Sequence, residues 1–205
     1  MTSAIKLIPK EILSNFEQKI VKFSQSITTR TKPGSVKYLL FGPETSRQSI
    51  SIKMGKIIGE ELPKLLISNS EFQLQECGIL KLESCNIKKD FDLIWIDEEN
   101  KVVYYRESKG NMELDTEKLP ATIDKVIQLE KELVEKYPDY TVNAGILNWS
   151  IYEREDADGG LMQIKKCEEK NVKIDHFKDF LQLLNFEWSK DEFTSYFRKL
   201  GEIIG

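Results

Sequence analysis

One stretch decides the fold: it runs from Phe91 to Lys109 and reads FDLIWIDEENKVVYYRESK. Its beginning and its end are rich in β-branched and aromatic residues, which favour strands, while residues 97–101 between them are polar. Two such runs joined by a short polar segment predict a β-hairpin. We therefore expect one strand over residues 91–96 and a returning strand over residues 102–109.

The register of this hairpin follows from the position of its turn. A turn centred on residues 99 and 100 places Asp92 opposite Glu107, and the same count places Asp90 opposite Lys109. Side chains alternate between the two faces of a strand, so these four charged residues are expected on one face. The other face is expected to carry Phe91, Leu93, Trp95, Tyr104 and Arg106.

The charged face of the hairpin indicates metal chemistry. Side chains directly opposite each other have Cβ atoms about 4.5–5.5 Å apart, so two opposed carboxylates repel unless a cation lies between them. Mg²⁺ prefers oxygen ligands, and Asp92 and Glu107 would supply them, with the Ser108 backbone carbonyl as a further ligand. Lys109 would position or activate the attacking water and stabilise negative charge on a phosphate, as phosphodiester hydrolysis requires. The competing interpretation is an exposed hairpin with cross-strand ion pairs, each contributing little to stability.

The segments on both sides of the hairpin predict helices. Before it we expect helices over residues 9–27 and about 46–61, a loop over 28–35, a short strand over 37–41, and an irregular strand over 72–84. Pro63 is expected to end or kink the second helix near Glu61, because proline cannot donate the helical hydrogen bond. After the hairpin we expect helices over about 120–136, 176–185 and 190–202, strands within 141–151 and near 172–174, and a loop over 153–161. Ser189 and Glu192 form a capping box for the last helix. Strands flanked by helices predict an α/β fold with a mixed central sheet.

Length and composition favour one globular domain. The chain has 205 residues, of which 40% are apolar and 31% charged, as in an ordinary globular protein with a sizeable core. No apolar run reaches the roughly 20 residues of a membrane span, and the N-terminus lacks the apolar segment of a signal peptide. Three cysteines without close pairing suit a reducing compartment. We therefore expect a cytoplasmic protein that does not bind a membrane.

Charge and motifs narrow the possible partners. A net charge of −4 is compatible with DNA binding, because acidic metal ligands lower the total until cations bind. No glycine-rich phosphate loop is present, so no nucleotide cofactor is expected. His176 is the only histidine and no Cys-x-x-Cys occurs, which argues against a zinc site.

Asp92 on one arm of the hairpin and Glu107-Ser108-Lys109 on the other resemble the signature of the PD-(D/E)xK nucleases. That group includes type II restriction endonucleases, Holliday-junction resolvases and repair nucleases. The resemblance covers about residues 60–130 and implies a restriction-endonuclease-like core, here about residues 46–150, and a Mg²⁺-dependent cut in DNA. It also implies that Asp92 and Glu107 bind the metal and that Lys109 is the catalytic lysine. Phe91 stands where the pattern has proline, and Asp90 remains an alternative to Asp92.

The resemblance further implies an acidic residue from an upstream helix. Glu61 is the first candidate, because it lies on the helix face of Ile57 and Leu65, and Glu60 is the second. Segments just after the catalytic strand and at the start of the second helix would contact the DNA backbone, with helix capping as the competing explanation. The candidates for this contact are Arg47, Ser49, Asn111 and Lys118.

These features predict a type II restriction endonuclease that cuts double-stranded DNA with Mg²⁺. We expect a single nuclease domain over residues 1–205, with a helical C-terminal part from about residue 176. A palindromic target would favour a two-fold homodimer, since each subunit then cuts one strand. Two alternatives remain: a structure-specific or repair nuclease of the same superfamily, and a DNA-binding protein that keeps the fold without catalysis.

Overall fold

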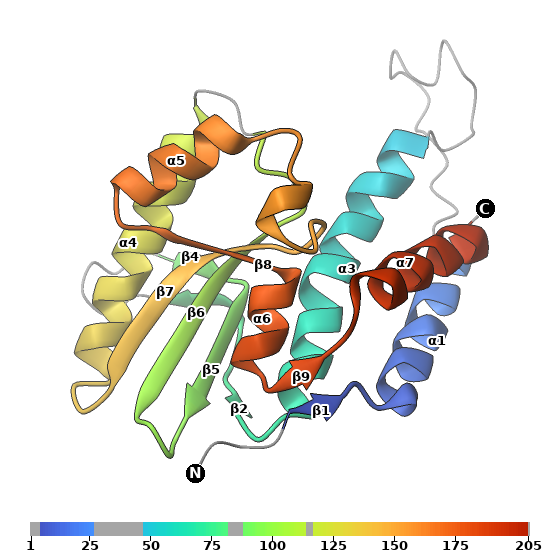
Figure 1. Ribbon diagram of the computed structural model, residues 1–205. Helices are drawn as coiled ribbons and strands as arrows, with labels where there is room; N and C mark the ends of the chain where they lie inside the picture. Colours follow the sequence, from blue (N-terminus) through green and yellow to red (C-terminus); the bar gives the residue numbers. More distant parts are fainter. Residues whose placement is uncertain (1–4, 27–46, 82–87, 114–116, 205) are drawn as a thin grey trace.

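The computed structural model describes residues 5–26, 47–81, 88–113 and 117–204, and among them a five-stranded mixed sheet forms the centre (Figure 1). In order across the sheet, its strands are β2 (Gln73–Leu74), β5 (Leu93–Asp97), β6 (Val102–Lys109), β7 (Thr141–Asn148) and β8 (Lys173–His176). The pairs β2–β5 and β5–β6 are antiparallel, whereas β6–β7 and β7–β8 are parallel. The prediction of an α/β fold with a mixed central sheet is therefore confirmed.

Helices cover both faces of this sheet (Figure 1). One face carries α1 (Lys10–Ser26), α3 (Arg47–Ser68), α6 (Phe177–Leu183) and α7 (Lys190–Ile204). The other face carries α4 (Lys118–Lys136) and α5 (Leu161–Glu169). Smaller elements are the parallel pair β1 (Lys6–Leu7) and β9 (Phe186–Glu187), the antiparallel pair β3 (Gly78–Lys81) and β4 (Lys88–Phe91), and the 3₁₀ turn η1 (Arg154–Asp156). Among the described residues, no helix combines the length and apolar character that a membrane crossing requires.

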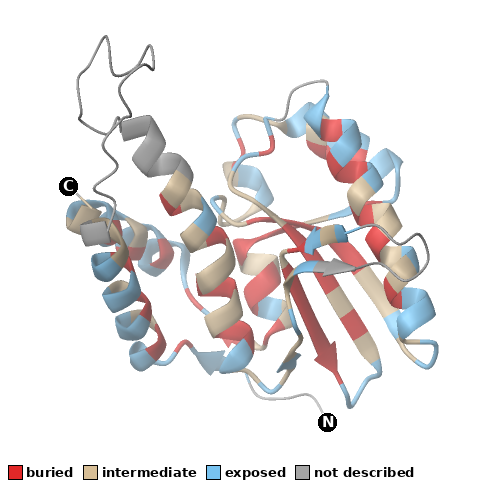
Figure 2. Ribbon diagram, turned by 180° about the vertical axis from the view of Figure 1, so that it is seen from behind, coloured by how far each residue is buried: buried red, intermediate tan, exposed pale blue. Residues whose placement is uncertain are grey.

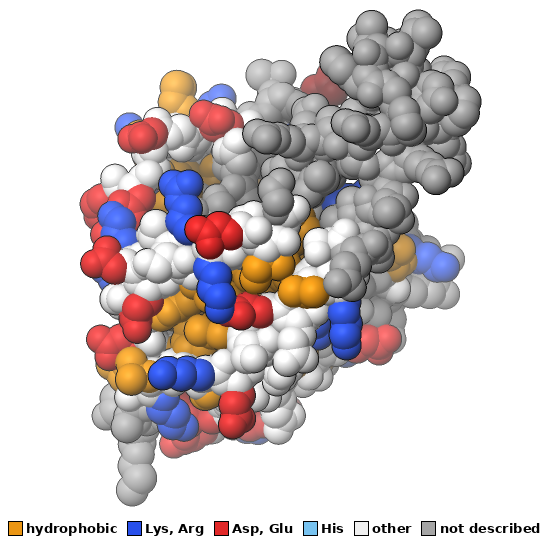
Figure 3. Space-filling view, turned by 90° about the vertical axis from the view of Figure 1, so that its right-hand side faces the viewer, with side chains coloured by type: hydrophobic (Ala, Val, Ile, Leu, Met, Phe, Trp, Pro, Cys, Tyr) orange, Lys and Arg blue, Asp and Glu red, His pale blue; other side chains and the backbone are white. Residues whose placement is uncertain are grey.

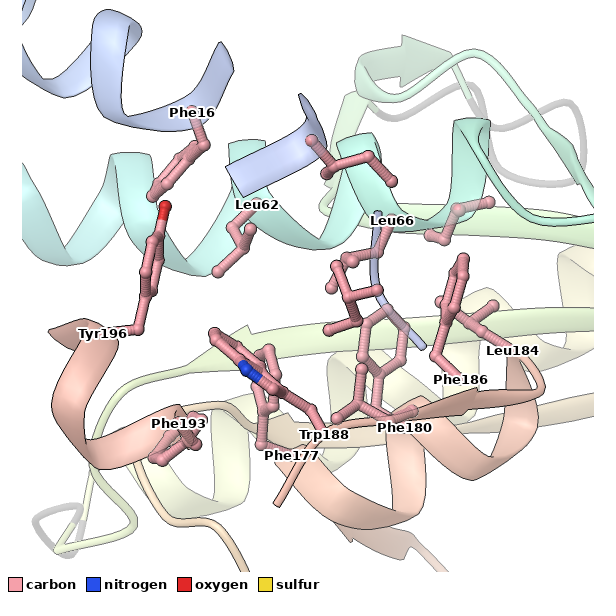
Figure 4. Close-up of a cluster of buried hydrophobic side chains, with 14 of the residues drawn as sticks. Phe16, Leu62, Leu66, Phe177, Phe180, Leu184, Phe186, Trp188, Phe193 and Tyr196 are labelled. Atoms are coloured by element: carbon pink, nitrogen blue, oxygen red, sulfur yellow. The ribbon is translucent and has the colours of Figure 1, made fainter. Parts of the chain in front are cut away.

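Each face of the sheet has its own hydrophobic core. Leu93 and Trp95 of β5 belong to the core beneath α1, α3, α6 and α7, whereas Ile94 and Ile96 belong to the core beneath α4 and α5. All of β5 is buried, and Figure 2 shows the middle of the sheet buried between the two helical layers. This double burial explains the continuous apolar run of the strand. Figure 4 shows part of the first core, including Phe16, Leu62, Leu66, Phe177, Phe180, Trp188 and Tyr196.

The β5–β6 hairpin has the predicted register. Trp95 pairs with Tyr104, and their rings stack with centroids 5.0 Å apart. The ladder ends where Leu93 pairs with Arg106. These pairs are the ones that a turn centred on residues 99 and 100 predicts. The register could be predicted because the turn and both strands are neighbours in sequence.

Asp92 interrupts the strand, and this changes the predicted faces. β4 ends at Phe91 and β5 begins at Leu93, so the alternation of side chains does not run through Asp92. Phe91 packs against Tyr105 in the second core, with ring centroids 5.8 Å apart, and the prediction that it shares the face of Leu93 is wrong.

Asp90 belongs to a different pairing from the one predicted. It pairs with Ile79 of β3 and not with Lys109, whose neighbour in the sheet is Asn148 of β7. The irregularity predicted near Gly78 is present: Gly78 has φ of +100°, a conformation that glycine adopts readily, and it starts β3.

Pro63 lies inside α3, so the helix does not end near Glu61; the other predicted outcome, a kink at that point, stays a prediction. A proline leaves the carbonyl four residues earlier, here that of Gly59, without its helical donor. The hydroxyl of Ser108 donates to this Gly59 oxygen at 2.6 Å, so the sheet supplies the missing hydrogen bond. Gly59 also permits close packing, because a Cβ atom there would lie 2.3 Å from Nε1 of Trp149.

Other expectations are confirmed, with one helix missed. The helices predicted over 9–27, 120–136 and 190–202, and the strand within 141–151, match α1, α4, α7 and β7. The capping box is present: Glu192 accepts from the amide of Ser189 at 2.9 Å and from its hydroxyl at 2.6 Å. Helix α5 was not predicted, since it is short and only Ile164 and Cys167 are buried on it. The loop and strand expected over 28–41 lie outside the described residues.

A buried ion pair ties the parallel strands together. Arg106 is fully buried, and its Nε donates to Oδ2 of Asp175 at 2.6 Å. Its other donors bind the backbone oxygens of Tyr105 and Asn143 and the side chain of Asn143. Gly145 of β7 allows β8 to approach, because a Cβ atom there would lie 2.6 Å from the Lys173 carbonyl oxygen. The charge is tolerated in the interior because its donors are satisfied.

Removal of one partner of the Arg106–Asp175 ion pair is expected to destabilise the fold strongly. Asp175→Ala leaves Arg106 buried without its counter-charge, which costs about 3–5 kcal/mol in the free energy of unfolding measured with urea. The double variant Arg106→Met/Asp175→Leu should recover most of that loss. Lys173→Ala, which removes the half-exposed partner of the other Asp175 oxygen, is the control and should cost less than about 1 kcal/mol. A single variant as stable as this control would contradict the assignment.

A second prediction concerns the hydrogen bond between sheet and helix. Ser108→Ala leaves the Gly59 carbonyl without a donor and is expected to cost about 1–3 kcal/mol. In a Pro63→Ala background the new amide at position 63 can donate to that carbonyl, so the same substitution should cost less. Equal costs in both backgrounds, measured by chemical unfolding, would show that Pro63 and Ser108 are not coupled.

Candidate active site

Asp92, Glu107 and Lys109 come together at the end of β6. The backbone amide of Ser108 donates to Oδ2 of Asp92 at 2.8 Å, which holds this carboxylate beside the strand that carries Glu107. Nζ of Lys109 lies 2.8 Å from Oε1 of Glu107. The interruption at Asp92 thus places its side chain against β6 although Asp92 is itself outside both neighbouring strands.

The three side chains differ in exposure. That of Glu107 is 4% exposed, that of Asp92 12% and that of Lys109 27%. The phenolic hydroxyl of Tyr105 donates to Oε2 of Glu107 at 2.8 Å, so this oxygen is partnered from its own strand as well. The site is therefore a pair of largely buried carboxylates with a lysine at its more open side.

A second lysine completes the site, and the sequence did not reveal it. Nζ of Lys125, on α4, lies 2.5 Å from Oε2 of Glu107 and 3.9 Å from Oδ1 of Asp92. Lys125 follows the buried Thr122 by three residues and precedes the buried Leu129 by four, so it stands on the sheet-facing side of the helix. That spacing was the available signal: a lysine within an otherwise buried stripe.

Burial and charge move the pKa values of the two carboxyl groups in opposite directions. Burial, followed by the proximity of Glu107, raises the pKa of Asp92 to about 7, although Lys125 and the Ser108 amide oppose this. Burial alone would raise the pKa of Glu107 too, but the ammonium groups of Lys109 and Lys125 outweigh it and hold this pKa below its usual value. Burial and Glu107 raise the pKa of Tyr105, which keeps its hydroxyl a donor. Glu107 is therefore the carboxylate that stays ionised, whereas the raised pKa of Asp92 lets it gain or lose its proton near neutral pH.

The oxygen atoms at this site suit a hard cation. Within a strand the N–H and C=O of one residue point the same way, so the Ser108 carbonyl is directed to the same side as the amide that binds Asp92. Asp92, Glu107 and this carbonyl form an all-oxygen donor set of the kind that Mg²⁺ prefers. In the described part of the chain no three His, Cys, Asp or Glu side chains are grouped for a metal. An ion here would thus need water or substrate oxygens as its other ligands, which is usual for Mg²⁺.

The upstream glutamates lie apart from this pair. Glu61 faces α1, where Oε2 lies 3.0 Å from Nζ of Lys19, and no described contact joins it to Asp92, Glu107 or Lys109. Glu60 pairs with Lys64 at 3.3 Å on the same helix. The structure therefore does not bring the first candidate to the site, because the helix turns Glu61 toward α1.

Glu60, the second candidate, pairs with Lys56 and Lys64 on its own helix, and no described contact joins it to Asp92, Glu107 or Lys109. Burial is the main reason that the pKa of the Cys77 thiol is raised, and Asp92 and Glu60 both raise it further through charge. Both carboxylates therefore lie within electrostatic range of one thiol. The described contacts therefore bring neither Glu61 nor Glu60 to the pair of carboxylates.

The residues proposed to contact DNA are less closely grouped. Asn111 is exposed, and its Oδ1 accepts from the amide of Glu113 at 2.7 Å, which gives it a role in the turn after β6. Lys118 is exposed at the start of α4, and Arg47 is the first residue of α3. The side chains of Arg47 and Ser49 lie outside the described residues. On the face in Figure 3, basic and acidic side chains are intermingled and form no broad field of one sign.

Comparisons with known proteins add no further assignment. A scan against protein-family models and searches of curated proteins and of solved structures find no match for the chain. The case for a function therefore rests on the geometry and charge of the group Asp92, Glu107, Lys109 and Lys125.

The raised pKa of Asp92 gives a pH dependence of stability. Between about pH 4, where Asp92 titrates in the unfolded chain, and about pH 7, the folded state keeps the proton more strongly, so stability falls as pH rises. Asp92→Asn removes this loss and should be more stable than the wild type at pH 8, by on the order of 2–4 kcal/mol, and nearly equal to it at pH 4. Urea unfolding with a chelator present, over pH 4–8, measures this. The control is Asp90→Asn, the same change at an exposed position. If the stability of Asp92→Asn depends on pH in the same way as that of this control, the raised pKa of Asp92 is refuted.

Proposed function

We propose that the chain is a Mg²⁺-dependent deoxyribonuclease of the PD-(D/E)xK type, with a type II restriction endonuclease as the first candidate. The observation that carries this proposal is the convergence of Asp92 and Glu107 with Lys109 beside the latter at 2.8 Å. A surface hairpin with isolated ion pairs would not bury its carboxylates, whereas here Glu107 is almost completely withdrawn from water. Burial of like charges is costly and is typical of sites that bind a cation or perform chemistry.

Each residue has a role in the proposed reaction. Glu107 is kept ionised by its lysines, so it is a ready cation ligand, and Asp92 is held beside it by the Ser108 amide. When bound, Mg²⁺ would supply Lewis acidity toward a phosphate oxygen. Lys109, at the more open side, would bind a phosphate oxygen or orient the attacking water and so stabilise the negative charge that develops there.

The arrangement of strands supports the same proposal. The resemblance implies a mixed sheet between helices, and the β5–β6 hairpin is part of such a sheet, with β6 as its middle strand. A two-fold homodimer that cuts both strands of a palindromic site is part of the proposal. So is a cytoplasmic location, which fits the free thiols Cys77 and Cys167.

One observation favours the non-catalytic alternative. Lys125 and Lys109 already neutralise Glu107, so the cluster can stand as a buried ion-pair network without a metal. A DNA-binding protein on this fold would need no more than that. Cleavage of DNA decides between the two functions.

Incubation of plasmid DNA with the protein and Mg²⁺ is the decisive experiment. We expect discrete fragments whose sequenced ends share a short motif, and no cutting in the presence of a chelator. Lys109→Ala and Glu107→Gln should each lower the cleavage rate by about 10²–10³-fold while DNA binding persists. The first removes the ammonium group that stabilises developing negative charge, and the second removes a charged ligand of the cation. Lys131→Ala, which removes an exposed lysine of α4, is the matched control and should cut normally.

The other results separate the alternatives. Cutting of branched or damaged DNA without a common end sequence would favour a structure-specific or repair nuclease. DNA binding without any cutting by the wild-type protein would favour the binding protein. Normal cutting by Lys109→Ala would remove this lysine from the mechanism.

A further inference from the structure

Lys125 occupies a special position between the two carboxylates. Among the described residues it is the cationic side chain whose ion pairs reach both Glu107, at 2.5 Å, and Asp92, at 3.9 Å. The ion pair of Lys109 is made with Glu107. Lys125 comes from α4, the helix that follows the hairpin, and only 19% of its side chain is exposed.

This position conflicts with binding of a cation by both carboxylates. A cation held by Asp92 and Glu107 together has to lie near the oxygens that Lys125 now approaches. Two positive charges a few ångströms apart repel strongly where burial lowers the effective dielectric constant. The ammonium group and the cation therefore compete for the same oxygens.

We propose that Lys125 is a displaceable counter-charge, which holds Asp92 and Glu107 together without a cation and has to move aside when a divalent cation binds. The inference rests on the proposed function in so far as the cation is its cofactor. It assigns to Lys125 a positioning role that lowers cation affinity.

The chemistry of lysine suits such a role. Its charge is a compact ammonium group on a flexible four-carbon stem, so the group can leave the carboxylates by side-chain rotation while α4 stays in place. Arg106 on the opposite face shows the contrast: its planar group is fully buried and bound by several fixed acceptors. The partly exposed Lys125 is not locked in this way.

Titration of Mg²⁺ alone, without DNA, tests the inference by calorimetry. Lys125→Met keeps the apolar stem but removes the charge, and it is expected to bind the cation at least about tenfold more tightly than the wild type, a change of about 1.4 kcal/mol. Lys125→Gln, which can still donate a hydrogen bond to Glu107, should also bind more tightly and serves where the Met variant folds poorly. Lys125→Arg keeps the charge and should retain the weak wild-type affinity. Lys131→Met, the same change at an exposed site of α4, is the control.

Thermal unfolding gives an independent readout. Without a cation, Lys125→Met should melt below the wild type, because its two carboxylates lose the charge that they share. Added Mg²⁺ should raise its melting temperature more than that of the wild type, since at a given concentration a ligand that binds the folded state more tightly stabilises it more.

The outcomes distinguish this inference from the proposed function. Tighter Mg²⁺ binding by the neutral variants supports the inference even if no DNA is cut, in which case the nuclease function fails. Unchanged or weaker binding by both neutral variants overturns it even if the wild type cuts DNA. Equally tight binding by Lys125→Arg also overturns it, because the charge would then not be responsible. Absence of Mg²⁺ binding in every variant overturns both.

Discussion

Two carboxylates withdrawn from water need positive charge within reach, and this requirement organises the centre of the molecule. Glu107 lies on a central strand and Asp92 at a break between strands, so neither can turn to solvent to lose its repulsion. Lys109, two residues further along β6, supplies part of this positive charge, and Lys125 of α4 supplies the rest. Ion pairs as well as hydrophobic contacts therefore contribute to the packing of α4 on the sheet.

Strand β6 carries two buried charges on successive residues, and the two faces of the sheet treat them differently. Arg106 points into the first core, where Asp175 and Asn143 bind it in a closed network. Glu107 points to the second face, where its partners are the buried Tyr105 and two lysines that keep part of their surface in water. A closed network serves stability and register, whereas partners with flexible stems can be exchanged for another cation. If the proposed function holds, the same strand therefore carries one charge that serves the fold, Arg106, and one that serves the reaction, Glu107.

Local features could be predicted from the sequence, and long-range ones could not. The hairpin register followed from a turn and two strands that are neighbours in the chain. The break at Asp92 could not be foreseen, because it depends on β4 pairing with β3. Pro63 was misjudged for a similar reason: the donor that makes it tolerable is Ser108, far away in sequence. Lys125 and the turning of Glu61 toward α1 likewise depend on how helices dock, which a single sequence does not reveal.

Ser108 shows how closely the candidate site is tied to the frame around it. As the middle residue of Glu-Ser-Lys it could be taken for a spacer, yet its amide holds Asp92 and its hydroxyl holds the Gly59 carbonyl of α3. The proline of α3 creates that free carbonyl, and the glycine lets the helix come close enough to use it. A shift of α3 would therefore disturb the hydrogen bond of the Ser108 hydroxyl and, if Ser108 moved with it, the hydrogen bond between its amide and Asp92. The helix that the sequence predicted to end or kink at Pro63 therefore contacts the same residue whose amide holds the Asp92 carboxylate.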